Sequence, residues 1–179
     1  PDKAAAKGAP QPHAEAPANI AFHWTVAGGD VDAAFSSAPV VVRDRIVQQR
    51  LIPNAMEPRA TLAKWAPASG ELTVWNTTQN PHIVRFLLSL DTGIPEHKIR
   101  VVAPEVGGGF GSKIPHYPED AMVVFASKML GRPVKWTETR NENFQATIHG
   151  RDHVQDVEMA AKKDGTILGL RATVWANLG

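Results

Sequence analysis

Hydrophobic residues recur along most of the chain with the two periods that regular secondary structure requires, and polar or glycine-proline stretches separate them. Residues 40–52 and 99–103 are rich in β-branched side chains, which favours extended strands. Ser69-Gly70 and Asp164-Gly165 each interrupt an alternating pattern, as the turns of β-hairpins do. We expect these turns to join residues 61–65 with 72–76 and residues 153–161 with 167–176.

Two longer segments carry helical signals. Asn80 as a capping residue and Pro81 at the first helical position predict a helix that Gly93 closes. A second helix is expected from Pro118 to Leu130, apolar nearly all round and therefore well buried. The first of these helices should present Ile83, Phe86, Leu87 and Leu90 as its apolar stripe. Shorter elements are expected as strands over residues 20–26 and 134–137, a helix over 31–38 and a helical or loop-like segment over 138–143.

These elements together predict a mixed α+β fold, with helices packed on a largely antiparallel sheet. Residues 1–19 are rich in alanine and proline and have no hydrophobic period, which is typical of a disordered linker. Residues 20–179 should then form the folded part. Because the chain begins without methionine and ends within a strand-like pattern, we expect it to be a fragment of a longer polypeptide.

Composition excludes several classes of function. The 19 Lys and Arg residues balance 18 Asp and Glu residues, so the sequence predicts no basic face for nucleic acid. The chain has no cysteine, which excludes disulfides, thiolate nucleophiles and iron–sulfur clusters bound by these residues. His149 and His153 have a metal-ligand spacing, but Gly150 and the strand pattern that follows argue against a metal site. The sequence therefore gives little support for a general-acid, hydrolase or zinc site in this stretch.

The stretch from Gly107 to Lys113 departs most from ordinary globular sequence, since four of its first five residues are glycine. It follows a predicted strand and precedes a predicted helix, a common setting for a ligand-binding loop. A mononucleotide P-loop would need glycine where Ser112 precedes the lysine, and a dinucleotide loop starting at Gly107 would also need glycine at Ser112. A glycine-rich turn remains the alternative, although Phe110 between glycines is unusual for a simple turn.

Gln79 lies directly before the predicted helix that begins at Pro81. The backbone N–H groups and the dipole at a helix N-terminus favour an anionic group, so a ligand that carries negative charge could bind beside Gln79. A lone glutamine there would most often be a turn residue. Arg140 is a second candidate that could reach a phosphate, although a surface salt bridge is the commoner fate of such an arginine.

The motif Gly-Gly-Gly-Phe-Gly-Ser-Lys, with Thr78-Gln79-Asn80-Pro81 upstream, resembles the molybdenum hydroxylases of the xanthine oxidase family. The likeness is greatest to the large, molybdopterin-binding subunits of the carbon monoxide dehydrogenase type. Residues 53–59 and 93–99 also carry the resemblance, which extends from about Val40 to Gly179. It implies that residues 20–179 are the N-terminal part of a molybdopterin-binding domain.

The resemblance also implies roles for individual residues. Gln79 would donate its side-chain amide to a ligand of molybdenum, a role that glutamine can fill without titrating. Gly108, Gly109, Phe110 and Gly111 would lay their backbone against the metal end of the cofactor, with Phe110 helping to exclude water. The cofactor implied is molybdopterin with molybdenum, in the cytosine dinucleotide form. The resemblance also implies that this stretch supplies no protein ligand to the metal and no catalytic residue.

Purine-oxidising members of the family carry a glutamate directly after the motif lysine, where this chain has Ile114. This difference favours carbon monoxide, a small aldehyde or a heterocycle as the substrate. The resemblance further implies a general base downstream of Gly179, an iron–sulfur small subunit with 2Fe-2S clusters, a medium subunit with FAD, a dimer of heterotrimers and a cytoplasmic location that could include the inner face of the membrane. The alternative is a non-catalytic α+β interaction module whose glycine-rich loop is a structural turn.

Overall fold

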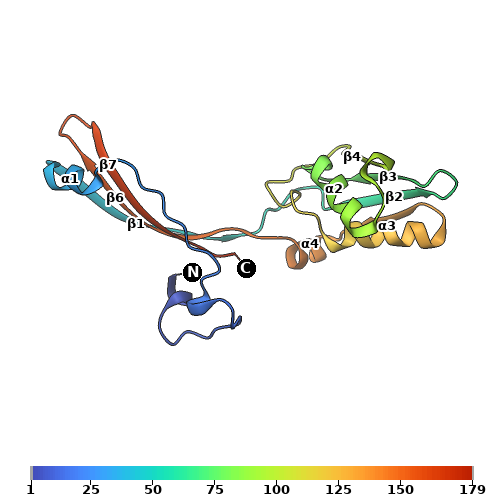
Figure 1. Cartoon of the computed structure of the whole chain (residues 1–179), viewed down its shortest axis with the longest axis horizontal. Coiled ribbons are helices and arrows are strands. Elements are labelled where there is room, and N and C mark those ends of the chain that lie inside the picture. Colours follow the sequence, from blue (N-terminus) through green and yellow to red (C-terminus); the bar gives the residue numbers. More distant parts are fainter. Residues whose placement is uncertain (1, 179) are drawn as a thin grey trace. The chain divides into compact units, whose positions relative to one another are not determined.

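The structure is a computed structural model that describes residues 2–178. The chain forms two compact units, one of residues 2–51 together with 151–178 and the other of residues 52–150 (Figure 1). No helix in residues 2–178 has the length and apolar character needed to cross a membrane.

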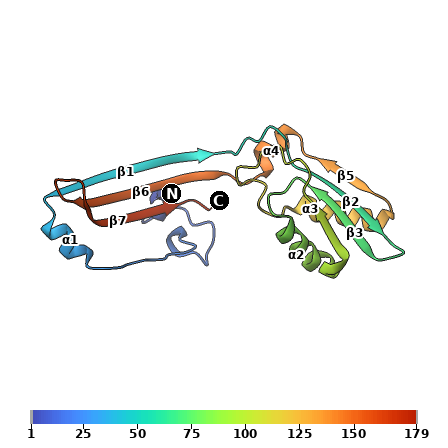
Figure 2. The same ribbon diagram turned by 90° about the horizontal axis from the view of Figure 1, so that it is seen from above.

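The first unit contains a three-stranded sheet in the order β1 (Val40–Leu51), β6 (Gly150–Ala161) and β7 (Ile167–Ala176) (Figure 2). β6 and β7 form the antiparallel hairpin that Asp164-Gly165 predicts. Gly165 has a φ of 88°, and the backbone N–H of Thr166 donates to Asp164 Oδ1 at 3.0 Å. Asp-Gly therefore supplies both the left-handed backbone and the side-chain acceptor of this turn.

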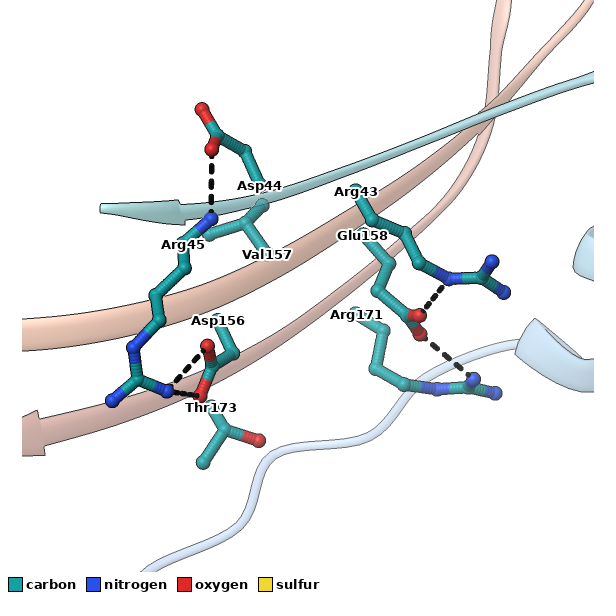
Figure 3. Close-up of a pocket in the computed structure, with 8 residues that line it drawn as sticks. All are labelled: Arg43, Asp44, Arg45, Asp156, Val157, Glu158, Arg171 and Thr173. Atoms are coloured by element: carbon teal, nitrogen blue, oxygen red, sulfur yellow. Dashed lines mark hydrogen bonds and ion pairs between the residues drawn. The ribbon is translucent and has the colours of Figure 1, made fainter. Parts of the chain in front are cut away.

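One face of this sheet carries a ladder of charged side chains, which Figure 3 shows. Arg43 pairs with Glu158, which also accepts a hydrogen bond from Arg171 at 3.2 Å. Arg45 pairs with Asp156 at 2.9 Å. The helix α1 (Val31–Ser37) packs on the same face, where Ala34 and Phe35 lie against Gly169 of β7. Alternate residues of a strand point to opposite faces, and the opposite face of this sheet exposes apolar side chains, namely those of Val42, Ile46, Leu170 and Val174.

The N-terminal residues contain two short 3-10 helices, η1 (Asp2–Ala5) and η2 (Pro17–Asn19). Asn19 Nδ2 donates to the carbonyls of Ala4 at 2.9 Å and Pro10 at 2.8 Å. That residues 1–19 serve as a disordered linker stays a prediction. The strand expected over residues 20–26 was wrong: this segment has no regular structure, and Phe22 and Trp24 are exposed. A strand needs a neighbour to complete its hydrogen bonds, and within the described residues none pairs with it.

The second unit contains a four-stranded sheet in the order β4 (Ile99–Val102), β3 (Glu71–Asn76), β2 (Ala60–Ala66) and β5 (Val134–Thr137). β2 pairs antiparallel with both β3 and β5, whereas β3 pairs parallel with β4. The parallel pair follows from the connection, because a helix between β3 and β4 returns the chain to the starting edge. The α+β fold with a largely antiparallel sheet is thus confirmed. The helices of this unit are α2 (Pro81–Thr92), η3 (Glu96–Lys98), α3 (Pro118–Leu130) and α4 (Arg140–Ala146).

The core of the second unit lies between one face of this sheet and the helices α2 and α3. The register places the buried sheet residues on a single face, since Ala63 lies opposite Val74 and Leu72 lies opposite Ile99. Both helices must therefore cover that face. The buried core residues are Ala63, Leu72, Val74, Val84, Leu88, Ile94, Ile99, Val123 and Val124.

The helices begin and end where the sequence predicts, but their buried faces differ from the prediction. Leu88 is fully buried, whereas Leu90 of the expected stripe is 65% exposed. α3 is also buried on one side only, with Val124 inside and Met129 exposed. A helix on a sheet has one covered side, and apolar residues around the whole helix cannot indicate which side that is. Asn80 precedes α2 as expected, but its side chain makes no capping hydrogen bond.

His116 links the two helices of the second unit. Its Nε2 lies 2.8 Å from Asp91 Oδ2 in α2, and its Nδ1 lies 3.5 Å from Asp120 Oδ2 in α3, an ion-pair distance without a directed hydrogen bond. The Asp120 carboxylate raises the pKa of His116 most, burial opposes this, and Asp91 raises it further. Asp120 is itself buried and accepts hydrogen bonds from Thr61 Oγ1 and Asn76 Nδ2, each at 2.6 Å. The protonated imidazole is therefore the charge that stabilises this contact.

Replacing His116 by glutamine should lower the free energy of unfolding in a pH-dependent way. Because the folded chain raises the pKa of His116 above 6.5, its stabilising effect is fully present below pH 6.5 and is lost as pH rises through the raised value. Urea unfolding from pH about 6 to about 9 measures this difference. The exposed His82, also on α2, provides the control variant His82→Gln. A constant difference between wild type and His116→Gln over this range would show that protonation of His116 does not stabilise the fold.

Candidate functional site

The glycine-rich loop connects β4 to α3 and has a left-handed backbone at several successive positions. Gly107 and Gly108 have φ angles of 60° and 91°, and Gly111 has a φ of 91°. Phe110 also has a positive φ of 52°, which is uncommon for a bulky residue, and its side chain is 73% exposed. A non-glycine residue in this conformation is held there by its surroundings, which is a feature of ligand-binding loops.

Gln79 and this loop lie in direct contact. The backbone N–H of Gln79 donates to the carbonyl of Lys113 at 2.9 Å. The backbone N–H of Gly111 donates to Gln79 Oε1 at 3.1 Å. Main chain and side chain of Gln79 are therefore attached to the same loop at two points.

The hydrogen bond from Gly111 determines which way the Gln79 amide faces. An N–H donor requires the oxygen end of the amide, so the Nε2 end must face away from Gly111. Gln79 is exposed, and within residues 2–178 its Nε2 has no hydrogen-bond partner. The side chain thus presents two uncharged N–H donors beside the loop.

Two of the glycines leave room for neighbouring side chains. A Cβ at Gly109 would overlap the amide of Gln79, and a Cβ at Gly107 would overlap the side chain of Glu57. Glu57 also donates its backbone N–H to Gly107 O at 3.3 Å. These glycines are therefore required because other parts of the protein approach the loop closely.

Further donors come from the loop backbone. Among the described residues, the N–H groups of Gly108, Gly109 and Phe110 make no hydrogen bond. Gly108 and Phe110 are exposed, and Gln79 Nε2, whose amide oxygen is bound to Gly111, adds an uncharged donor beside the loop. Such donors fit the oxygen and sulfur ligands of a metal held by an organic cofactor, because those ligands are hydrogen-bond acceptors. The residues present therefore fit a molybdopterin whose metal is not bound by the protein.

A buried polar cluster supports the end of the loop. Tyr117 donates its hydroxyl to Ser112 O at 2.6 Å, and the Arg59 guanidinium lies 3.7 Å from the centre of the Tyr117 ring. Arg59 binds the buried Glu138 through Nη2 at 2.6 Å. Burial raises the pKa of Tyr117 above 10.0, which keeps its hydroxyl protonated as a donor at neutral pH.

Other candidates from the sequence lie elsewhere or are engaged. Arg140 donates to Asn54 Oδ1 at 2.7 Å and to Asn143 Oδ1 at 2.8 Å, so its guanidinium holds protein groups. No cluster of three or more His, Asp or Glu residues suited to a metal occurs in residues 2–178. The sequence did not single out the burial of Lys113, or the contacts of Tyr117 and Arg59. The residues that contact Tyr117 and Arg59 come from distant parts of the chain, and no sequence signal indicates these contacts. For Lys113, its position in the glycine-rich motif was the one available signal of a role.

A separate hollow does not include the residues of this site. It has a volume of about 430 Å³ and lies on the charged face of the β1-β6-β7 sheet (Figure 3). Its arginines, Arg43, Arg45 and Arg171, are already paired with Asp and Glu side chains. Paired charges on an open sheet surface leave little free binding capacity, so the donors around Gln79 are the better candidate.

Known proteins with similar sequences are large subunits of oxidoreductases. The chain is 44% identical to the carbon monoxide dehydrogenase large chain of Hydrogenophaga pseudoflava over 164 residues, covering 90% of the chain and 20% of that relative. It is 38% identical to the nicotine 6-hydroxylase large subunit of Paenarthrobacter nicotinovorans, covering 92% of the chain and 20% of the relative. The chain thus spans about a fifth of the length of these relatives.

Solved structures show the same fold. The carbon monoxide dehydrogenase of Oligotropha carboxidovorans matches 82% of the chain, and the chain covers 18% of it, with a TM-score of 0.73 and 45% identity. The aldehyde oxidoreductase of Desulfovibrio gigas matches 97% of the chain, which covers 19% of it, with a TM-score of 0.80 and 26% identity. The family profile described as the molybdopterin cofactor-binding domain matches residues 12–179. The chain therefore belongs to the molybdopterin cofactor-binding domain family.

Proposed function

We propose that this chain is part of a molybdenum-dependent oxidoreductase and that Gln79 and the loop residues Gly108–Gly111 bind the metal end of its molybdopterin. The observation that carries the proposal is the orientation of the Gln79 amide. Gly111 occupies its oxygen at 3.1 Å, and Nε2 is left to donate. A simple turn residue would not need a glycine loop shaped around its amide, as the close approach at Gly109 indicates.

Each residue of the site would have a distinct task. Gln79 Nε2 would donate to one ligand of the metal, and the N–H groups of Gly108, Gly109 and Phe110 would hold neighbouring acceptor atoms of the cofactor. The exposed ring of Phe110 would cover the bound cofactor and exclude water. When bound, the cofactor supplies two-electron redox chemistry with oxygen derived from water. The chain's own contribution is to position the cofactor through uncharged donors.

The substrate is inferred from one position beside the site. Ile114 is 46% exposed and follows the motif lysine, where purine-oxidising members of the family carry a glutamate. An isoleucine offers no hydrogen bond to a purine. We therefore propose carbon monoxide, a small aldehyde or a heterocycle as the substrate, a range that the names of the relatives also span.

The remaining parts of the enzyme would lie outside residues 1–179. These are the general base, the cytosine dinucleotide portion of the cofactor site, a small subunit with 2Fe-2S clusters and a medium subunit with FAD, assembled as a dimer of heterotrimers. The relatives are about five times as long as the chain, which leaves room for the general base and the rest of the cofactor site in the same polypeptide, whereas the small and medium subunits would be separate chains. Residues 1–179 alone should accordingly have no turnover.

Replacing Gln79 by alanine in the full-length enzyme should lower kcat by about ten- to a hundredfold. The lost hydrogen bond is worth about 1–3 kcal/mol if its partner stays buried and unsatisfied. Gln79→Glu should be at least as harmful, because a carboxylate would face electron-rich metal ligands. Steady-state kinetics together with molybdenum analysis measure the effect, and Gln49→Ala on the exposed strand β1 is the control. If both variants keep the wild-type kcat and a full molybdenum content, Gln79 is only a turn residue and does not bind the cofactor.

Replacing Gly111 by valine should impair cofactor retention more than folding. No atom lies within 4 Å of a Cβ at this position, so the protein itself has space, but the φ of 91° resists a β-branched residue. The added side chain would also point into the region that the cofactor occupies. Molybdenum content and melting temperature of the full-length protein are the measurements. Gly28→Val, at an open position without a positive φ, is the control. If Gly111→Val retains its molybdenum and activity, the loop does not bind the cofactor.

A further inference from the structure

Lys113 closes the glycine-rich loop and is almost completely buried, with 2% of its surface exposed. Its Nζ donates to the carbonyl of Val106, at the beginning of the loop. Its own carbonyl accepts from Gln79 N at 2.9 Å and from Thr78 Oγ1 at 3.2 Å. One residue therefore connects the start of the loop, the end of the loop and the backbone of Gln79.

Burying a lysine without a purpose would destabilise the protein, because its charge loses hydration. Within residues 2–178 the ammonium group has one hydrogen-bond acceptor, Val106 O, although it can donate three hydrogen bonds. Burial lowers the pKa of Lys113 below its usual value, and the carboxylates of Glu57 and Glu138 act against this while Arg140 adds to it. A methionine could fill the same space at no cost in charge burial. The ammonium is thus costly to the fold, and its benefit must lie elsewhere.

We propose that Lys113 is a positioning residue that holds the glycine-rich loop in the conformation that binds the cofactor. Its side chain fixes Val106, and this sets the path of residues 107–112 between two anchored ends. The donors of Gly108, Gly109 and Phe110 then face the same ligand as Gln79. The positive charge of Lys113, which is hydrogen-bonded to the start of the loop, also favours acceptor atoms that carry negative charge. This inference rests on the proposed function, since it assumes that the loop binds molybdopterin.

The test compares Lys113→Met with wild type in the full-length protein. Methionine keeps the length of the side chain but removes the donor and the charge. Because Val106 is partly exposed, its carbonyl can accept from water instead, and the loss of a buried charge offsets the lost bond. We expect an unchanged or raised melting temperature. Molybdenum should nevertheless be lost about ten- to a hundredfold faster, and hydrogen exchange of residues 107–112 should increase.

The control is Lys135→Met, at an exposed lysine on β5, which should behave as wild type in all three measurements. A parallel fall of melting temperature and molybdenum retention in Lys113→Met would mean that Lys113 only stabilises the fold, and this would overturn the inference. Unchanged retention and exchange would also overturn it. Absence of molybdenum from the wild-type enzyme would refute the proposed function, whereas retention by both proteins refutes only the role of Lys113.

A second measurement needs no variant at Lys113. As pH rises through the lowered pKa of Lys113, the neutral amine becomes a weaker donor and loses its charge, so wild-type enzyme should release molybdenum faster. Burial raises the pKa of the neighbouring Tyr117 above 10.0, so its hydroxyl stays protonated up to about pH 10. His116, three residues from Lys113, also loses its charge as pH rises through its raised pKa, so the release rate is compared in wild type and His116→Gln, and the rise with pH should be present in both. A release rate that does not change with pH would contradict the proposal even if Lys113→Met failed to fold.

Discussion

The double attachment of Gln79 to the glycine-rich loop is the constraint on which the site depends. One hydrogen bond joins Gln79 N to Lys113 O, and a second joins Gly111 N to Gln79 Oε1. A Cβ at Gly109 would overlap the Gln79 amide, and Gly107, Gly108 and Gly111 have positive φ angles, which explains the glycines of this loop. The hydrogen bond from Gly111 orients the amide, so a ligand would not need to order it on binding.

The rest of the second unit holds the two partners of this contact at a fixed distance. Gln79 precedes α2 and the loop precedes α3, and both helices pack on the same face of one sheet through Val84, Leu88 and Val124. His116 adds a charged contact between the helices, and Tyr117 anchors the end of the loop at Ser112. The apolar core therefore determines the separation of the helices, and the polar contacts fix the orientation of the groups at their N-terminal ends.

The buried charge of Lys113 is better explained by function than by stability, unlike those of Arg59 and Glu138. Arg59 and Glu138 satisfy each other through hydrogen bonds at 2.9 and 2.6 Å, so their burial is compensated. Lys113 has less compensation, and its pKa is lowered by burial. A group that costs stability and lies against a candidate ligand site is expected to serve that site.

The sequence by itself determined the order and type of most elements and both hairpins, because strand alternation and turn residues act locally. The motifs singled out Gln79 and the glycine-rich loop, but the tertiary structure brings them into contact. Tertiary structure decided that Leu88 and not Leu90 is buried, that residues 20–26 form no strand, and that Lys113 lies inside the protein. The physical reason is that burial and strand pairing depend on neighbours distant in the chain, which local patterns do not specify.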